Sequence, residues 1–305
     1  MKIKSIKKIE HNENVYNLRI EDNHNYFAED ICVSNCHQAK AATLQSIMKR
    51  TFKHAYNRFG VSGTFPPEDS LEILSIQSVL GPIITEVSAT DLVKAGTITP
   101  MSIRAVILNH NQKEINDRLK YVRKQGAGAE AFRYEKDFIQ QSDKRLKFIQ
   151  KIVDKCDNNT LLLFHTIEYG KKIFEKLSSE LTDKEFYYID GEVSGKKREE
   201  IKANMDKSGG KVKIGICSFG TVGTGWSIKN LHYLIMADSF KSDIIIQQAI
   251  GRILRLFLGK SKAVIFDIVD VFSTDMNNIL YGHFLEREKM YKKKKYPYKI
   301  VKINL

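Results

Sequence analysis

An asparagine followed directly by a cysteine, Asn35–Cys36, offers the most distinctive chemistry in this sequence of 305 residues. The Asn35 side-chain amide can attack its own carbonyl carbon, which forms a succinimide and cleaves the 35/36 peptide bond. The Cys36 thiolate can accept an acyl group and return it to its own amine. The pair could therefore cut and rejoin a backbone, whereas the plainer interpretation is a loop dipeptide.

The residues before this pair have an order that fits such chemistry. A VYNL strand comes first, then His24 in NHNYFA, then an apolar ICV strand that leads to Asn35. This order resembles the C-terminal fragment of a split intein, a small β-rich (Hint) unit. The resemblance implies that the His24 imidazole, which can move a proton near pH 7, assists cyclisation. Two positions depart from the family pattern, because Ser34 stands where inteins generally have His and Asn17 where they often have Asp.

The composition favours a globular protein that binds a polyanion. Hydrophobic residues make up 42% of the chain, and its length suffices for two medium domains plus an appendage. The net charge of +13 makes nucleic acid, either DNA or RNA, the expected partner. The cysteines form no CxxC pair or ligand-spaced cluster, which argues against a disulfide framework and a metal site. A reducing cytoplasm fits this cysteine pattern. No run approaches the ~20 apolar residues of a membrane helix, so we expect no membrane partner.

Beyond the cysteine, helical patterns alternate with short apolar strands, which predicts an α/β fold with a parallel sheet. Helices are expected over 37–52, 70–81 and 88–96, with a strand over 54–63 and a buried strand over 104–109. The charged stretch 111–145 is expected to be a helical insertion or connector with a flexible joint. From residue 143 the alternation is regular and predicts one RecA-like doubly wound parallel sheet, with strands over 160–166, 185–190, 211–218, 231–238 and 262–270.

Two arginines near the end of a predicted helix could do phosphoryl chemistry. In QQAIGRILR, residues 247–255, Arg252 and Arg255 are three apart and would share one helix face. Two guanidiniums held together suit the negative charge of a transferring phosphoryl group, although an arginine pair alone is more often a solvated face. With Gln248 and Gly251 they complete the pattern QxxGRxxR.

Three further segments occur in an order that resembles superfamily 2 helicases over about residues 36–290. They are SGT at 62–64, TLLLFHT at 160–166 and SFGTVGTGWSIKNLHYLIM at 218–236. The resemblance implies that QxxGRxxR serves ATP hydrolysis and that SGT couples hydrolysis to domain motion. It also implies nucleic-acid contacts from the other two segments, whose small residues let a phosphodiester approach closely. The residues concerned are Ser62, Gly63 and Thr64 for coupling, and His165, Thr221, Gly223, Thr224 and Gly225 for nucleic acid.

The two resemblances meet at one bond. Superfamily 2 helicases have a DExH or DExD tetrad, whose acidic residues hold Mg²⁺ and position the attacking water. Cys36 and His37 would complete a DECH tetrad if a partner polypeptide ended in Asp-Glu directly before its own intein half. No GKT-type phosphate loop occurs in the sequence, so the isolated chain is expected to be inactive as an ATPase. ATP and Mg²⁺ would bind only after ligation to an N-terminal helicase half fused to an N-intein.

These expectations leave two functional alternatives open. One alternative is a nucleic-acid-binding remnant that never splices. The other is a double-strand translocase or annealing motor in place of an unwinding helicase. The Lys- and Tyr-rich segment 283–302 could contact phosphates and bases, or be a solvated helix end with a short strand. The chain is expected to divide into five parts: the C-intein fragment (1–35), the C-terminal part of a first RecA-like domain (36–103), a connecting strand and helical insertion (104–142), the complete second RecA-like domain (143–275) and a basic tail (276–305).

Overall fold

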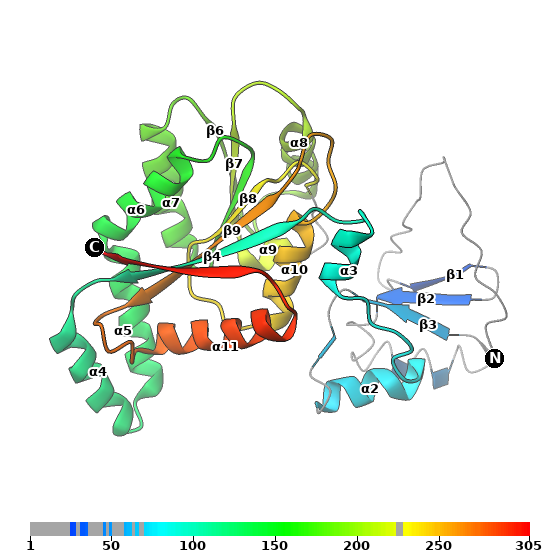
Figure 1. Cartoon of the computed structure of the whole chain (residues 1–305), viewed down its shortest axis with the longest axis horizontal. Coiled ribbons are helices and arrows are strands. Elements are labelled where there is room, and N and C mark those ends of the chain that lie inside the picture. The colour runs from blue at the N-terminus through cyan, green and yellow to red at the C-terminus, as the bar shows by residue number, and fades with distance from the viewer. Residues whose placement is uncertain are drawn as a thin grey trace. The chain divides into compact units, whose positions relative to one another are not determined.

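The computed structural model describes residues 25–28, 31–35, 45–46, 49–50, 58–62, 65–66, 70–223 and 228–305. The chain divides into two compact units, residues 1–84 and residues 85–305 (Figure 1).

The described residues of the first unit include a three-stranded sheet and the helix α2. β1 lies antiparallel to β2, and β2 lies parallel to β3, with Asn35 opposite Val61. In the helix, the Ser70 hydroxyl accepts a hydrogen bond from the Ile73 amide (3.2 Å), and Gly81, with φ of 84°, ends it. The strand and helix predicted over 54–63 and 70–81 are therefore confirmed. The elements are β1 (Asn25–Ala28), β2 (Ile31–Asn35), β3 (Arg58–Val61) and α2 (Leu71–Leu80).

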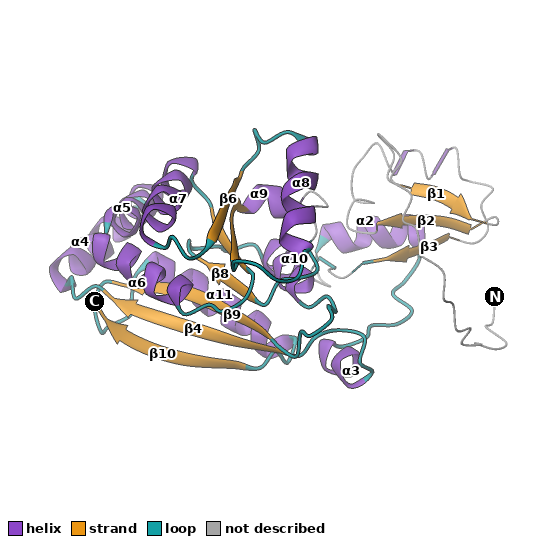
Figure 2. Ribbon diagram, turned by 90° about the horizontal axis from the view of Figure 1, so that it is seen from above, coloured by secondary structure: helices purple, strands orange, loops and turns teal. Residues whose placement is uncertain are grey.

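The second unit is built on a seven-stranded sheet in the order β10-β4-β9-β8-β5-β7-β6. Every neighbouring pair in it is parallel, and Figure 2 shows β10 beyond β4 at one edge and β6 at the other. The predicted parallel α/β fold is confirmed. The strands are β4 (Met101–Asn109), β5 (Thr160–Phe164), β6 (Glu185–Ile189), β7 (Lys213–Ser218), β8 (Tyr233–Met236), β9 (Ala263–Val271) and β10 (Tyr298–Asn304).

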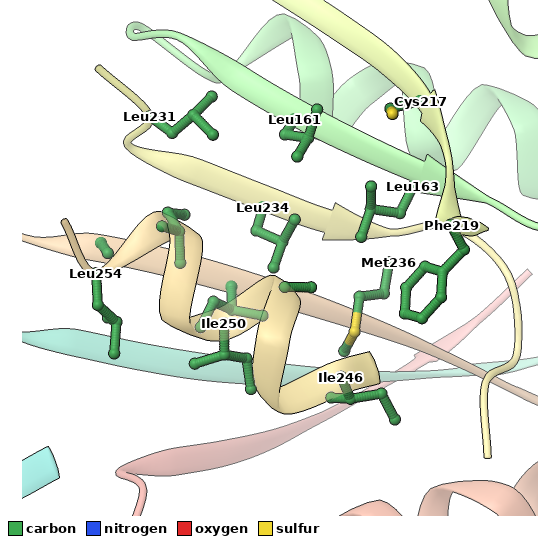
Figure 3. Close-up of a cluster of buried hydrophobic side chains, with 14 of the residues drawn as sticks. Leu161, Leu163, Cys217, Phe219, Leu231, Leu234, Met236, Ile246, Ile250 and Leu254 are labelled. Atoms are coloured by element: carbon green, nitrogen blue, oxygen red, sulfur yellow. The ribbon is translucent and has the colours of Figure 1, made fainter. Parts of the chain in front are cut away.

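Helices cover both faces of this sheet, so its central strands are buried on both sides. One buried cluster joins α6 and α7 to the sheet, and another joins α8, α9, α10 and α11 to its opposite face. Figure 3 shows the second cluster, where Ile246 and Ile250 of α10 lie over Leu234 and Met236 of β8. This double cover explains the continuous apolar run TLLLF of β5. The helices are α6 (Asp143–Asp154), α7 (Ile167–Glu180), α8 (Gly195–Asp206), α9 (Phe219–Gly223), α10 (Asp243–Ile253) and α11 (Ile279–Lys293).

The sheet takes in strands from outside the range 143–275 predicted for the second RecA-like domain. β4, expected in the connector, pairs with β9, and β10, expected in the basic tail, pairs with β4. The rest of the connector is helical as predicted, and Gly126, with φ of 84°, forms its joint. The tail is the helix α11 followed by a strand, as in the plainer alternative. The remaining helices are α3 (Ala89–Lys94), α4 (Lys113–Lys124) and α5 (Gly128–Gln141).

Candidate functional site

The helix α10 holds most of the predicted QxxGRxxR motif. Its buried residues fix the helix against β8 (Figure 3), while the motif residues lie at or near the surface. Gln248 and Arg252 are half-buried and Gly251 is exposed. The apolar spacing of the helix therefore determines which of its residues remain available to a ligand.

Arg255 lies outside the helix, which corrects the prediction that both arginines share one helix face. The helix ends at Ile253, Leu254 caps it, and Arg255 follows in a bend with an exposed side chain. Burial, together with the like charge of Arg255, lowers the pKa of Arg252 to about 10. The Arg252 guanidinium is thus still protonated at neutral pH, and Arg255 is close enough to influence it.

A buried lysine and a threonine hold the backbone that carries Arg255. Lys260 Nζ donates hydrogen bonds to the carbonyl oxygens of Ile253 and Arg255, the latter at 3.0 Å. The Thr99 hydroxyl also donates to the Arg255 carbonyl (3.2 Å), and the Thr99 amide donates to that of Leu254 (2.8 Å). Burial lowers the pKa of Lys260 to about 8. Sequence reasoning missed both residues, although a lysine just past a helix end is a usual partner for the last carbonyls.

The predicted nucleic-acid residues that the structure describes, His165, Thr221 and Gly223, lie at the carboxyl edge of the sheet. His165 follows β5 and is exposed, and its backbone amide donates to Asp238 Oδ2 (3.3 Å). The buried Asp238 also accepts from Gln140 Nε2 (3.2 Å) and from the Ser239 amide (2.9 Å). Asp238 therefore joins the ends of β5 and β8 to the end of α5. Its role was not recognised in the sequence, where an Asp after an apolar strand was the available signal.

Thr221 belongs to the short helix that follows β7. Its hydroxyl lies 2.8 Å from the Ser218 hydroxyl, and both side chains are buried. Phe219 stacks on Phe240, which in turn contacts the His165 ring edge-on. The Thr221 hydroxyl therefore stabilises the turn after β7, and Gly223 is the last residue of α9.

The Arg255 backbone lies at the opposite edge of the sheet from His165 and Thr221. The Arg255 backbone is tied to Thr99, just before β4 begins, whereas His165 and Ser218 stand where β5 and β7 end. Helices between parallel strands run back to the amino edge, so the end of α10 cannot lie at the carboxyl edge. The structure therefore places the Arg255 backbone at the amino edge of the sheet.

Several predicted site residues fall outside the described part of the chain. Of the others, Ser62 follows β3 and is half-buried, and the backbones of Ser34 and Asn35 pair with Asn25 and Val61 in the small sheet. In the part that the structure describes, no group of three His, Cys, Asp or Glu residues could hold a metal, and no helix is long and apolar enough to cross a membrane. The residues outside are Asn17, His24, Cys36, His37, Gly63, Thr64, Thr224 and Gly225.

Comparison with known families identifies the part of the chain that includes α6 to α10 and both arginines. Residues 143–257 match the model of the helicase conserved C-terminal domain. These residues form a helicase C-terminal domain. The seven-stranded sheet accordingly has the RecA-like fold of such domains.

Relatives of this helicase domain extend the similarity to most of the chain. The ATP-dependent DNA helicase uvsW of Enterobacteria phage T4 is 30% identical over 284 residues, which cover 88% of this chain and 54% of the phage protein. The crystal structure of T4 UvsW matches with a TM-score of 0.54 and 25% identity, over 89% of this chain and 53% of that one. The DNA-bound Type ISP restriction-modification enzyme LlaBIII shares the fold, with a TM-score of 0.60 at 13% identity over 91% of this chain and 22% of its own. This chain spans about half the length of uvsW.

Proposed function

We propose that the chain is a trans-splicing precursor that carries the C-terminal half of an ATP-dependent DNA helicase or translocase. The observation that carries the helicase part of this proposal is the pair Arg252 and Arg255, at and just after the end of α10 inside a helicase C-terminal domain. The splicing part rests on the sequence order that ends in Asn35–Cys36. The similarity to uvsW, which is named an ATP-dependent DNA helicase, supports DNA as the substrate. The +13 charge suits contact with the phosphate backbone.

The splicing step would use residues at the end of β2. A partner's N-intein shifts the upstream acyl group to its own thiol, and the Cys36 thiolate takes it as a thioester. Asn35, assisted by His24, then cyclises to a succinimide and releases the intein as the 35/36 bond breaks. The Cys36 amine attacks the thioester, which frees the thiol and leaves an ordinary amide.

The first unit has a strand arrangement that suits the ligated product. β2 lies parallel to β3, so their carboxyl ends share one edge, and Cys36 and Ser62 follow these two ends. An incoming strand that ended in Asp-Glu would take the position of β2 once residues 1–35 leave. A DECH tetrad with Cys36 and His37 would then form beside the segment Ser62–Thr64.

In the ligated protein the residues of this chain would bind and orient ATP and nucleic acid. The partner's GKT loop and acidic pair would hold ATP and Mg²⁺, and the metal would neutralise phosphate charge. Arg252 and Arg255 would stabilise the charge of the transferring phosphoryl group, with Gln248 and Gly251 shaping that helix end. The phosphodiester backbone would be contacted at the carboxyl edge by His165, Thr221, Gly223, Thr224 and Gly225.

A reconstitution experiment tests this function. The purified chain is mixed with an N-terminal helicase half that carries a GKT loop, a terminal Asp-Glu and an N-intein. We expect a ligated product that lacks residues 1–35, and DNA-stimulated ATPase activity in that product only. The Asn35→Ala variant should accumulate the unreleased intermediate and give no product. Full ligation by this variant would refute the splicing step, and an inactive ligated product would refute the motor.

A second candidate is a nucleic-acid-binding protein that never splices, and the pairing of β2 with β3 favours it. The strand that ends in Ser34 and Asn35 already lies beside β3, where the acidic strand would have to be. Ser and Asn offer no carboxylate to hold Mg²⁺, so such a protein would bind nucleic acid without hydrolysing ATP. Partner binding without ligation over hours would favour this candidate.

The motif residues named above would serve a double-strand translocase or annealing motor as well as an unwinding helicase. These motors differ in the DNA product that they form. The ligated protein should therefore be assayed on forked and on branched DNA. Release of a single strand from a fork supports unwinding, whereas branch migration without strand release supports the annealing motor.

A further inference from the structure

A basic and aromatic surface lies on the helical hairpin α4–α5, and none of the predicted site residues belongs to it. The hairpin follows the carboxyl end of β4 and returns to the sheet, where Gln140 of α5 donates a hydrogen bond to the Thr166 hydroxyl (2.9 Å). Figure 1 shows α4 and α5 side by side at the end of the unit that is remote from α3. The hairpin thus extends outward from the same sheet edge as His165.

Cations line an open hollow of about 440 Å³ on this hairpin, next to the loop between β9 and α11. Arg123 Nη2 donates to the Asn277 carbonyl (2.5 Å), which fixes the guanidinium on the wall. Lys120 Nζ is 3.0 Å from Asp117 and 3.5 Å from Asp275, both of them exposed carboxylates. Within the described ranges, Lys124 has no acidic partner. The hollow is lined by Lys120, Arg123, Lys124 and Asn277.

An exposed aromatic ring, that of Tyr121, follows Lys120 on α4. The Tyr121 side chain is 66% exposed, and it shares a helix face with Lys124, three residues on. A tyrosine this exposed gains little from packing within the protein. Aromatic rings beside lysines and arginines are the usual surface for single-stranded nucleic acid, because bases stack on the ring while phosphates meet the cations.

Buried polar contacts hold the hairpin in place, so the hollow is preformed. Glu135 of α5 is buried, and its carboxylate accepts hydrogen bonds from the amides of Ile279 and Leu280 (both 3.0 Å) and from Asn278 Nδ2 (3.1 Å). Asn116 of α4 donates to the Ser273 hydroxyl (2.9 Å). A ligand would therefore meet two helices and the Arg123 guanidinium already in position.

We infer that the hollow beside Tyr121 is a second binding surface for single-stranded nucleic acid, separate from the carboxyl-edge residues of the helicase domain. Lys120, Arg123 and Lys124 bind successive phosphates, and one base stacks on Tyr121. This inference rests on the proposed function only in that the chain acts on nucleic acid. It requires neither splicing nor ATP.

Binding of a fluorescent oligo-dT strand and of a matched duplex to the full 305-residue chain tests the surface. The variant Lys120→Gln/Lys124→Gln is compared with Lys196→Gln/Lys197→Gln, which removes the same charge from exposed positions of α8. The logarithm of the binding constant for oligo-dT falls linearly with the logarithm of the salt concentration, by ~0.7 for each phosphate that a cation contacts. We expect the hairpin variant, which loses two such contacts, to make this slope less steep by about 1.4, and the α8 variant to leave the slope unchanged. Tyr121→Ala should weaken oligo-dT binding about tenfold and duplex binding little, whereas Tyr121→Phe keeps the ring and the affinity.

The outcomes separate this surface from the proposed function. Equal slopes for the hairpin and α8 variants, or equal losses of strand and duplex binding in Tyr121→Ala, would overturn the surface and leave the motor proposal intact. If the unaltered chain binds no nucleic acid, the proposed function fails first and the surface falls with it. Circular dichroism of each variant shows whether a loss of binding comes from unfolding.

Discussion

Asp267 and Asp270 of β9 face opposite sides of the sheet, and each binds a buried arginine through two hydrogen bonds. Asp267 accepts from Nε and Nη2 of Arg287 on α11 (3.0 and 2.9 Å), and Asp270 accepts from Nε and Nη2 of Arg145 on α6 (both 2.8 Å). An odd separation along a strand places two side chains on different faces. One central strand is therefore fixed to a helix on each side of the sheet.

Replacing Arg145 by Met should lower the free energy of unfolding by ~3–5 kcal/mol, because it removes the guanidinium that pairs with the buried Asp270 carboxylate and leaves, among the described residues, only His110 beside it. Although burial opposes ionisation, Arg145 and His110 hold the pKa of Asp270 at about 2. Urea unfolding monitored by circular dichroism measures the loss. The control Lys176→Met removes an exposed pair with Glu180 and should cost less than about 0.5 kcal/mol. A loss below about 1 kcal/mol for Arg145→Met would show that the pair contributes little.

Stability should fall as the pH drops from about 6.5 toward 4, in part because of His283. Burial, helped by Arg287 and Lys241, lowers its pKa from 6.5 to about 4, and its Nδ1 lies 3.1 Å from the Ser239 hydroxyl. Between these values the unfolded chain takes up a proton that the folded chain does not, so acid favours unfolding. Unfolding free energies at about pH 4.5 and pH 7 measure the effect. The His283→Gln variant should show a smaller difference between them, and an unchanged difference would exclude His283 as a cause.

Arg255→Ala should reduce the ATPase rate of the ligated protein by roughly 10³ while leaving its melting temperature unchanged. The side chain is exposed, so the fold does not depend on it, whereas an arginine that contacts the phosphoryl group contributes about that factor. Single-turnover ATP hydrolysis and a thermal melt measure the two quantities. The nearby exposed Lys262 serves as the control, since Lys262→Ala removes a charge without touching the motif. Similar ATPase rates for the two variants would show that Arg255 does not take part in ATP hydrolysis.

Lys260→Met should destabilise the domain by about 1–3 kcal/mol, because the carbonyls of Ile253 and Arg255 lose a buried donor. The bend that presents Arg255 would also loosen, so the ligated protein should hydrolyse ATP more slowly. Chemical denaturation and ATPase assays follow both effects, with Lys262→Met as the exposed counterpart. If Lys260→Met is as stable as this counterpart, the lysine does not hold the bend.

Continuous apolar runs made most of the parallel sheet predictable from the sequence. Every residue of β5 and β7 is buried, and such strands occur in sheets that helices cover on both faces. β10 could not be assigned in the same way, because Tyr298–Asn304 mixes lysines with apolar residues and stays mostly exposed at the edge. Its partner β4 is remote in the sequence, so no local pattern indicates the pairing.

The site was predictable in its residue types but not in its geometry. The motif QxxGRxxR identified the arginines, yet helix propensity could not show that the helix stops before Arg255, since no Gly or Pro marks that end. The partners Thr99 and Lys260 become neighbours of Arg255 only through the fold. Likewise, the spacing of Asp267 and Asp270 has meaning only once both faces of the sheet are covered.

The pairing of β4 with β10 has a consequence for how the domain folds. Asn109 and Asn304 are register partners, yet 195 positions separate them. Closing so long a segment is entropically unfavourable, so the β4–β10 contact is expected to form late during folding. Until it forms, the outer edge of β4 presents unpaired amides and carbonyls to other chains. Refolding is therefore expected to be slow and to compete with aggregation as protein concentration rises.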